Sequence, residues 1–138
     1  MKYLFDSNPL IYFLNSTLPI TGDHLVSVGL RDGAAYSIIT RIEVLGFPMS
    51  PEETNAARRL LGGLTEMGLT ESILRRTITL RQQYRRLKIP DAIIAATAIE
   101  SALPLVTRNT VDFSAIAGLR IIDPFHGEGT DGHPTETA

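Results

Sequence analysis

The stretch MKYLFDSNPLIYFL, residues 1–14, decides the fold of this chain. Its segment KYLFD, residues 2–6, is typical of a short buried strand, and that strand ends on the acid Asp6. Asn8 and Pro9 then begin a helix, because proline is tolerated in a first turn and the apolar residues that follow keep a helical period. The stretch therefore predicts a strand, an acid at its carboxyl end and a helix.

The rest of the chain repeats this alternation of strands and helices. Strands are expected at 34–39, 104–107 and 119–122, and helices at about 23–30, from Thr40 to before Pro48, from Ser50 to about 67–68, at 72–87, at 92–102 and, shorter, within 109–116. The helix from Ser50 begins with Ser50-Pro51-Glu52-Glu53, a capping box with proline at the first helical position. The alternation predicts an α/β fold with a mostly parallel sheet, and such sheets bind ligands beyond the carboxyl ends of their strands.

Composition restricts the class of protein. With 43% apolar and 20% charged residues the chain has an ordinary soluble composition, and the absence of cysteine excludes disulfide and thiolate chemistry. No apolar run reaches the roughly 20 residues that span a bilayer. We expect a cytoplasmic protein without a membrane partner, with one domain over residues 1–125 and a disordered tail over residues 126–138.

Cations gather in one segment, although the net charge is −2. Between Ser72 and Pro90 there is no acid, and the cations there are Arg75, Arg76, Arg81, Arg85, Arg86 and Lys88. A solvated helix face is the simpler interpretation of such a run. The alternative is a surface that follows the phosphates of a nucleic acid, and the charges alone leave both open.

Four acids lie at or just after the expected strand ends, and they are Asp6, Glu43, Asp91 and Asp112. Each has a structural explanation. Asp6 and Asp91 can cap helices, Glu43 can complete a capping box with Thr40, and Asp112 suits a turn. Together they indicate a cation site, because clustered carboxylates repel one another and oxygen-rich sites suit Mg²⁺ or Mn²⁺. Such ions act mainly on phosphate esters.

Several segments match a known family in its order, from residue 3 to about residue 125. They are LFDSN (4–8), SIITRIEVL (37–45), DAIIAATA (91–98), LVTRN (105–109), DF (112–113), GL (118–119) and DP (123–124). On these segments the chain resembles the PIN-domain ribonucleases, and more narrowly the VapC toxins of bacterial toxin–antitoxin pairs. The resemblance implies a PIN-like three-layer α/β/α fold, a homodimer and an antitoxin of the VapB type.

The resemblance also implies Mg²⁺- or Mn²⁺-dependent endoribonuclease activity. The catalytic and metal-binding acids would be Asp6, Glu43, Asp91 and Asp112. The fourth position is shared, since many relatives carry an acid where this chain has Asn109, whereas others rely on the acid before the phenylalanine, here Asp112. Asn8 would orient Asp6, and Thr107 would place a hydroxyl near the metal.

We expect hydrolysis of RNA by metal-activated water, to give a 5′-phosphate and a 3′-hydroxyl. A histidine base is not expected, because His24 falls in a helix and His126 and His133 fall in the tail. Candidates for binding RNA phosphates are Arg108, Arg85 and Arg86.

Two other functions stay open at this stage. The first is a non-catalytic PIN-like module that binds RNA or protein, which the amide at Asn109 would allow. The second is an aspartyl-nucleophile phosphatase, which also begins with an aspartate at the end of its first strand. Those phosphatases usually carry a second aspartate two residues later, where this chain has Asn8.

Overall fold

The computed structural model describes residues 1–126, so residues 127–138 of the expected tail lie outside the described part. The elements in chain order are β1 (Leu4–Phe5), α1 (Ser7–Leu14), α2 (Ile20–Asp32), β2 (Ala35–Ser37), α3 (Ile38–Leu45), α4 (Pro51–Gly62), β3 (Thr65–Met67), α5 (Glu71–Gln83), α6 (Ile89–Glu100), β4 (Leu105–Val106), α7 (Thr110–Ser114) and β5 (Ile121–Ile122). The predicted α/β fold is confirmed. No helix among the described residues is long and apolar enough to cross a membrane.

The strands form one sheet in the order β3-β2-β1-β4-β5, and all neighbouring pairs are parallel. From β1 the chain first adds β2 and β3 on one side of the sheet and then β4 and β5 on the other. The direction in which strands are added therefore reverses between β1 and β4. In open parallel sheets a crevice for ligands forms at this point, outside the carboxyl ends of the strands. Asp6 directly follows β1 and Thr107 directly follows β4, which places both residues at that crevice.

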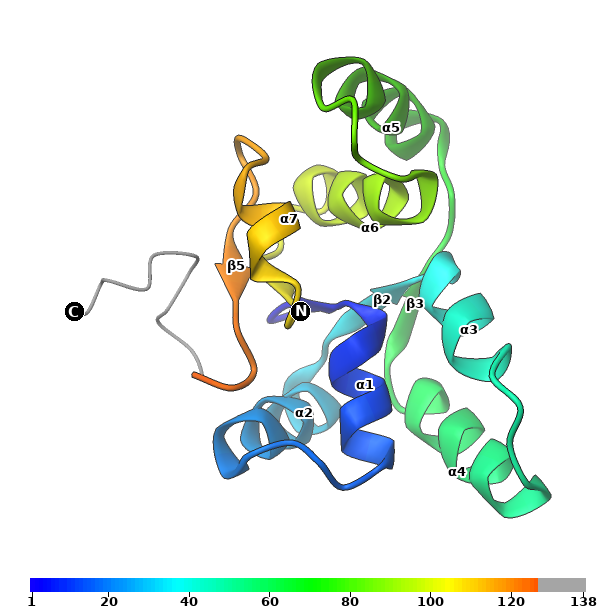
Figure 1. The fold of residues 1–138 in the computed structure, drawn as a ribbon. Helices are drawn as coiled ribbons and strands as arrows, with labels where there is room; N and C mark the ends of the chain where they lie inside the picture. The colour runs from blue at the N-terminus through cyan, green and yellow to red at the C-terminus, as the bar shows by residue number, and fades with distance from the viewer. Residues whose placement is uncertain (127–138) are drawn as a thin grey trace.

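Helices cover both faces of the sheet, as Figure 1 shows with α5 and α6 on one side and α1, α2 and α4 on the other. Neighbouring residues of β1 point to opposite faces. Phe5 packs with the apolar side chains of α1, α2 and α4, whereas Leu4 packs with those of α5 and α6. Both faces of the strand are buried, which explains its run of apolar residues. The three-layer arrangement that the resemblance implied is confirmed.

The expected capping box at Thr40 is wrong. Helix α3 begins at Ile38, and its N-cap is Ser37, whose side chain accepts a hydrogen bond from the backbone N–H of Ile39 at 3.1 Å. Strand β2 ends earlier than expected, so the helix starts before Thr40 and carries that residue into its buried side. Glu43 is therefore free of a capping role.

Two other expected boundaries are also wrong. Helix α4 ends at Gly62 and is followed by the edge strand β3, although the helix was expected to reach about 67–68. The backbone of Thr65 pairs with Ala34, and this contact between distant segments outweighs the local helical pattern. Helix α6 begins at Ile89, so Asp91 lies in its first turn and does not cap it. The capping box at Ser50 is confirmed.

Candidate active site at the carboxyl end of the sheet

Asp6 is a buried carboxylate at the centre of the candidate site. Its backbone N–H donates to the carbonyl of Val106 at 2.9 Å, which ties the end of β1 to β4. Thr107 Oγ1 donates to Asp6 Oδ2 at 2.8 Å, and Asn8 Nδ2 lies 3.3 Å from the same oxygen. Asn8 and Thr107 therefore both contact the same oxygen of the Asp6 carboxylate.

Burial raises the pKa of Asp6 from its ordinary 3.8 to about 6. The hydrogen bonds from Thr107 and from the Ser7 backbone oppose this rise, and the charges of Asp91 and Glu43 add to it. A carboxylate in these surroundings is stabilised in its ionised form by a cation.

Glu43 projects from α3 and is exposed, and Ser7 holds its position. Ser7 Oγ lies within hydrogen-bond distance of Glu43 Oε1 and 3.1 Å from the hydroxyl of Thr40. Ser7 begins α1 directly after Asp6, so the same turn of chain contacts two acids. The sequence analysis assigned Ser7 no role, although its place between Asp6 and Asn8 at a strand end was a usable signal.

Asp91 is half-buried in the first turn of α6. Burial raises its pKa above the ordinary value, the charges of Glu43 and Asp112 raise it further, and Lys88 opposes them. The charges of Asp91 and Glu43 also raise the pKa of Asp6. Glu43, Asp112 and Asp6 are therefore each coupled electrostatically to Asp91.

Asp112 and Asn109 lie together at the position of the family's fourth acid. Asn109 Nδ2 donates to Asp112 Oδ2 at 3.2 Å, and the backbone N–H of Asn109 donates to Thr107 Oγ1 at 3.0 Å. Asp112 is exposed on α7, whereas Asn109 precedes that helix. The amide orients the carboxylate, so the two residues are partners at this position.

A pocket of about 650 Å³ opens beside these acids. Its lining includes the acids Asp91 and Asp112 and three cations of the loop between α5 and α6. These cations are Arg85, Arg86 and Lys88. Cations beside the carboxylates would favour the approach of an anionic polymer.

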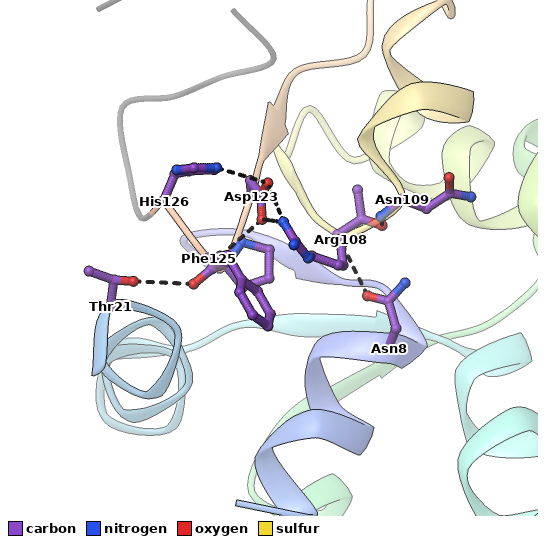
Figure 2. Close-up of polar contacts among 9 residues, drawn as sticks. Asn8, Thr21, Arg108, Asn109, Asp123, Phe125 and His126 are labelled. Carbon is purple, nitrogen blue, oxygen red and sulfur yellow. Dashed lines mark hydrogen bonds and ion pairs between the residues drawn. The ribbon is translucent and has the colours of Figure 1, made fainter. Parts of the chain in front are cut away.

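Arg108 is not among the described residues that line this pocket, and its side chain instead contacts Asp123 and Phe125. Its Nη1 lies 3.1 Å from Asp123 Oδ2, and its guanidinium lies 4.0 Å from the centre of the Phe125 ring. Figure 2 shows Arg108 between these two residues. The sequence analysis gave Asp123 no role, and its segment DP was the only signal.

The chain is similar to known proteins over most of its length. The PIN domain family model matches residues 3–119. Ribonuclease VapC10 of Mycobacterium tuberculosis (strain CDC 1551 / Oshkosh) is 32% identical over 121 residues, which cover 85% of this chain and 90% of the relative.

Solved structures show the same fold. A toxin–antitoxin complex from Klebsiella pneumoniae contains a chain that is 33% identical, with a TM-score of 0.72, over 89% of this chain and 98% of that one. A chain of DNA-bound VapBC from Salmonella typhimurium matches with a TM-score of 0.80 at 22% identity, over 90% of this chain and 98% of that one, and at this identity it supports the fold alone. The chain belongs to the PIN-domain family, with VapC ribonucleases among its relatives.

Proposed function

We propose that this chain is a divalent-metal-dependent endoribonuclease that acts as the toxin of a toxin–antitoxin pair. The observation that carries the proposal is the cluster of Asp6, Glu43, Asp91 and Asp112 at the point where the direction in which strands are added reverses. Carboxylates that raise one another's pKa at a ligand crevice favour a cation and a phosphate ester. The similarity to Ribonuclease VapC10 supports RNA as the ester.

The donor set fits Mg²⁺ or Mn²⁺. Within residues 1–126 no group of three or more acidic, histidine or cysteine side chains is already arranged to hold one ion. Mg²⁺ does not need such a cage, because it is usually bound by one or two carboxylates and keeps several waters. Asp6 and Asp91 would hold the ion, and Glu43 and Asp112 would hold a second ion or the coordinated waters.

Each residue around the ion has a definite task. When bound, the ion activates water for attack on the phosphodiester and stabilises the charge on the leaving oxygen. Thr107 and Asn8 fix Asp6 Oδ2, so the ligand does not have to reorganise. Ser7 holds Glu43 in the same way.

The substrate would approach through the pocket beside Asp91 and Asp112. Arg85 and Arg86 line it and would bind RNA phosphates, whereas Arg108 is paired with Asp123 and contributes less to substrate binding. Phosphate contacts of this kind make affinity depend on salt. Arg85→Gln with Arg86→Gln should therefore raise KM for RNA and flatten its dependence on salt concentration.

The cellular partners are part of the proposal. A VapB-type antitoxin would inhibit the chain, which is supported by the 33% identity with a chain of the Klebsiella pneumoniae toxin–antitoxin complex. A homodimer is the assembly that the family resemblance implies. Size measurement by light scattering and co-expression with the antitoxin encoded beside the gene would test both statements.

The decisive experiment compares wild type with Asp6→Ala and Asp91→Ala on RNA in the presence of Mn²⁺. Both variants should lose cleavage by about 1000-fold while staying folded, and excess EDTA should stop the wild type until Mn²⁺ is restored. Sequencing of RNA 5′ ends should find 5′-phosphates at the cuts. Glu71→Gln, which alters an exposed ion pair of α5, serves as the control and should cut normally.

Wild-type rates in Asp6→Ala protein, or cleavage that persists in excess chelator, would contradict the proposal. Growth arrest on expression that Asp91→Ala relieves would separate a nuclease from a non-catalytic module. A phosphorylated Asp6 trapped with a phosphate ester would favour the aspartyl-nucleophile phosphatase.

A further inference from the structure

Asp123 is a buried carboxylate that the proposed mechanism does not use. It follows β5 directly, at the same edge of the sheet as the four acids. Its partner is the Arg108 guanidinium, with Nη1 at 3.1 Å from Oδ2 and 3.5 Å from Oδ1. A buried carboxylate next to a nuclease site needs an explanation, because a negative charge there repels the substrate phosphates.

The ion pair extends the pairing between β4 and β5 by one position. The backbone N–H of Thr107 donates to the carbonyl of Ile122 at 3.0 Å, which is the last backbone contact between the two segments. The next residue on each side is Arg108 and Asp123, and their side chains make the following contact. The carboxylate thus continues the sheet past the point where its backbone separates.

Arg108 belongs to the turn 107–109, whose hydrogen bonds hold Asp6 in place. The backbone N–H of Arg108 donates to Asn8 Oδ1 at 3.1 Å, and Asn8 Nδ2 in turn lies near Asp6 Oδ2. Thr107 Oγ1, which receives the Asn109 N–H, donates to the same Asp6 oxygen. A displacement of this turn would therefore move both groups that fix Asp6.

The residues that follow Asp123 hold it against the helices α1 and α2. The backbone N–H of Phe125 donates to Asp123 Oδ1 at 2.9 Å, and the Phe125 ring packs edge-on against Tyr12 of α1 at 5.7 Å between ring centres. Thr21 of α2 donates to the carbonyl of Pro124 at 3.3 Å. Figure 2 shows how residues 123–126, which we call the anchor segment, lie between α2 and Arg108.

We propose that Asp123 is a positioning residue for phosphodiester hydrolysis, which holds Arg108 and thereby the turn 107–109 that fixes Asp6. The Phe125 ring stacks on the same guanidinium and shields one side of the ion pair. His126 Nε2, 3.7 Å from Asp123 Oδ2, lies at its exposed side. The inference rests on the proposed nuclease function.

The first test is the kinetics of Asp123→Asn. Asparagine keeps an acceptor for the Phe125 N–H and removes only the charge that binds Arg108. We expect kcat to fall by about 10- to 100-fold with KM within about twofold of wild type, since a small misplacement of a reacting group costs rate rather than affinity. Glu100→Gln is the matched control, because it breaks the Arg76–Glu100 pair, whose arginine is 43% exposed against 42% for Arg108. It should leave kcat unchanged.

The second test does not depend on catalysis. The Arg108 backbone N–H should exchange with deuterium about 10-fold faster in metal-free Asp123→Asn than in wild type, and at the wild-type rate in Glu100→Gln. If Asp123→Asn fails to fold, Arg108→Gln breaks the same ion pair from its more exposed side and should give the same two results. The double variant should lose no more kcat than either single one, because both remove one contact.

Two results would overturn the inference. One is unchanged kcat together with unchanged Arg108 exchange. The other is a lower KM without loss of kcat, which would mean that Asp123 only keeps Arg108 from binding RNA. Wild-type protein that cuts no RNA would instead refute the nuclease proposal, while the exchange measurement would still decide whether Asp123 holds the turn.

Discussion

The ionisation of Asp6 couples the site to the stability of the fold. With a pKa of about 6 in the folded chain and the ordinary 3.8 when unfolded, the carboxylate costs about 3 kcal/mol once it is charged in the native state. Below about pH 4 it is protonated in both states and costs nothing. As the pH rises from about 4 to about 6, the unfolded chain loses its proton first, so the free energy of unfolding falls.

Asp6→Asn should remove this penalty. In EDTA at pH 7.5 the variant should unfold with a free energy about 3 kcal/mol above wild type, and at pH 3.5 the two should be equal, as measured by urea denaturation. Mg²⁺ should raise the stability of the wild type at pH 7.5 but not that of the variant. Equal stabilities at both pH values would mean that Asp6 is not held in a desolvated site.

The hydroxyl of Thr107 lowers the pKa of Asp6, so its removal has a predictable direction. Thr107→Val keeps the shape of the buried side chain and deletes both the hydrogen bond to Asp6 Oδ2 and the acceptor of the Asn109 N–H. The pKa of Asp6 should rise further, and the acidic limb of the pH–rate profile should move to higher pH, with a loss of about 10-fold in rate at pH 6.

Thr97→Val is the matched control for this variant. Thr97 is equally buried, but its hydroxyl bonds only to the Ile93 carbonyl of its own helix, at 2.7 Å. It should leave the pH profile in place. A profile that moves in both variants would indicate a general loss of packing instead of a local effect on Asp6.

For single residues, the sequence predicts a site residue best where a polar side chain stands directly after an apolar strand. Asp6 could be recognised because its polar side chain directly follows a short apolar strand, whereas Asn8 and Thr107 were implied by the family resemblance. Asp123 also follows a strand, but its contact with Arg108 depends on a pairing of β4 with β5 that no local pattern contains.

Among the elements, α4 has the clearest local determinant of stability. Ser50 Oγ accepts from the Glu53 N–H at 3.1 Å, and Glu53 Oε1 accepts from the Ser50 N–H at 2.9 Å. Ser50→Ala should lower the free energy of unfolding by about 1 kcal/mol without changing RNA cleavage, whereas Ser50→Asp should keep the cap and the stability. Thermal denaturation checks both, and a loss of cleavage in Ser50→Ala would contradict the separation of α4 from the site.

The misplaced ends of α3 and α4 have different causes. Thr40 and Glu43 have the spacing of a capping box, yet Ser37 at the end of β2 caps the helix earlier by accepting from the Ile39 N–H. The edge strand β3 has a weak local pattern and forms because β2 offers it backbone partners. Local patterns therefore predict the kind of element well, whereas a competing cap or contacts between distant segments decide its ends.

At the scale of the whole molecule, the anchor segment depends on a close approach to α2. A Cβ at Gly22 would lie 2.7 Å from the Pro124 carbonyl oxygen and 2.8 Å from Leu18 Cδ2, so the segment would have to shift. Gly22→Ala should cost about 1–3 kcal/mol of unfolding free energy and reduce kcat as Asp123→Asn does.

Gly62→Ala provides the comparison for this prediction. A Cβ at Gly62 meets nothing within 4 Å, so alanine there should raise stability by about 0.4–1 kcal/mol with no effect on cleavage. Denaturant titration and initial rates distinguish the two variants. A Gly22→Ala protein with normal kcat would show that the anchor segment tolerates displacement.

The position of β1 in the middle of the sheet has a consequence for synthesis. Asp6 emerges among the first residues, but its partner Thr107 follows 101 residues later, and Asp123 later still. Contacts of such separation form last, since the entropy of closing a long loop must be overcome first. A growing chain on the ribosome therefore holds an incomplete carboxylate site until almost all of the sheet has been translated, which delays cleavage of the RNA around it.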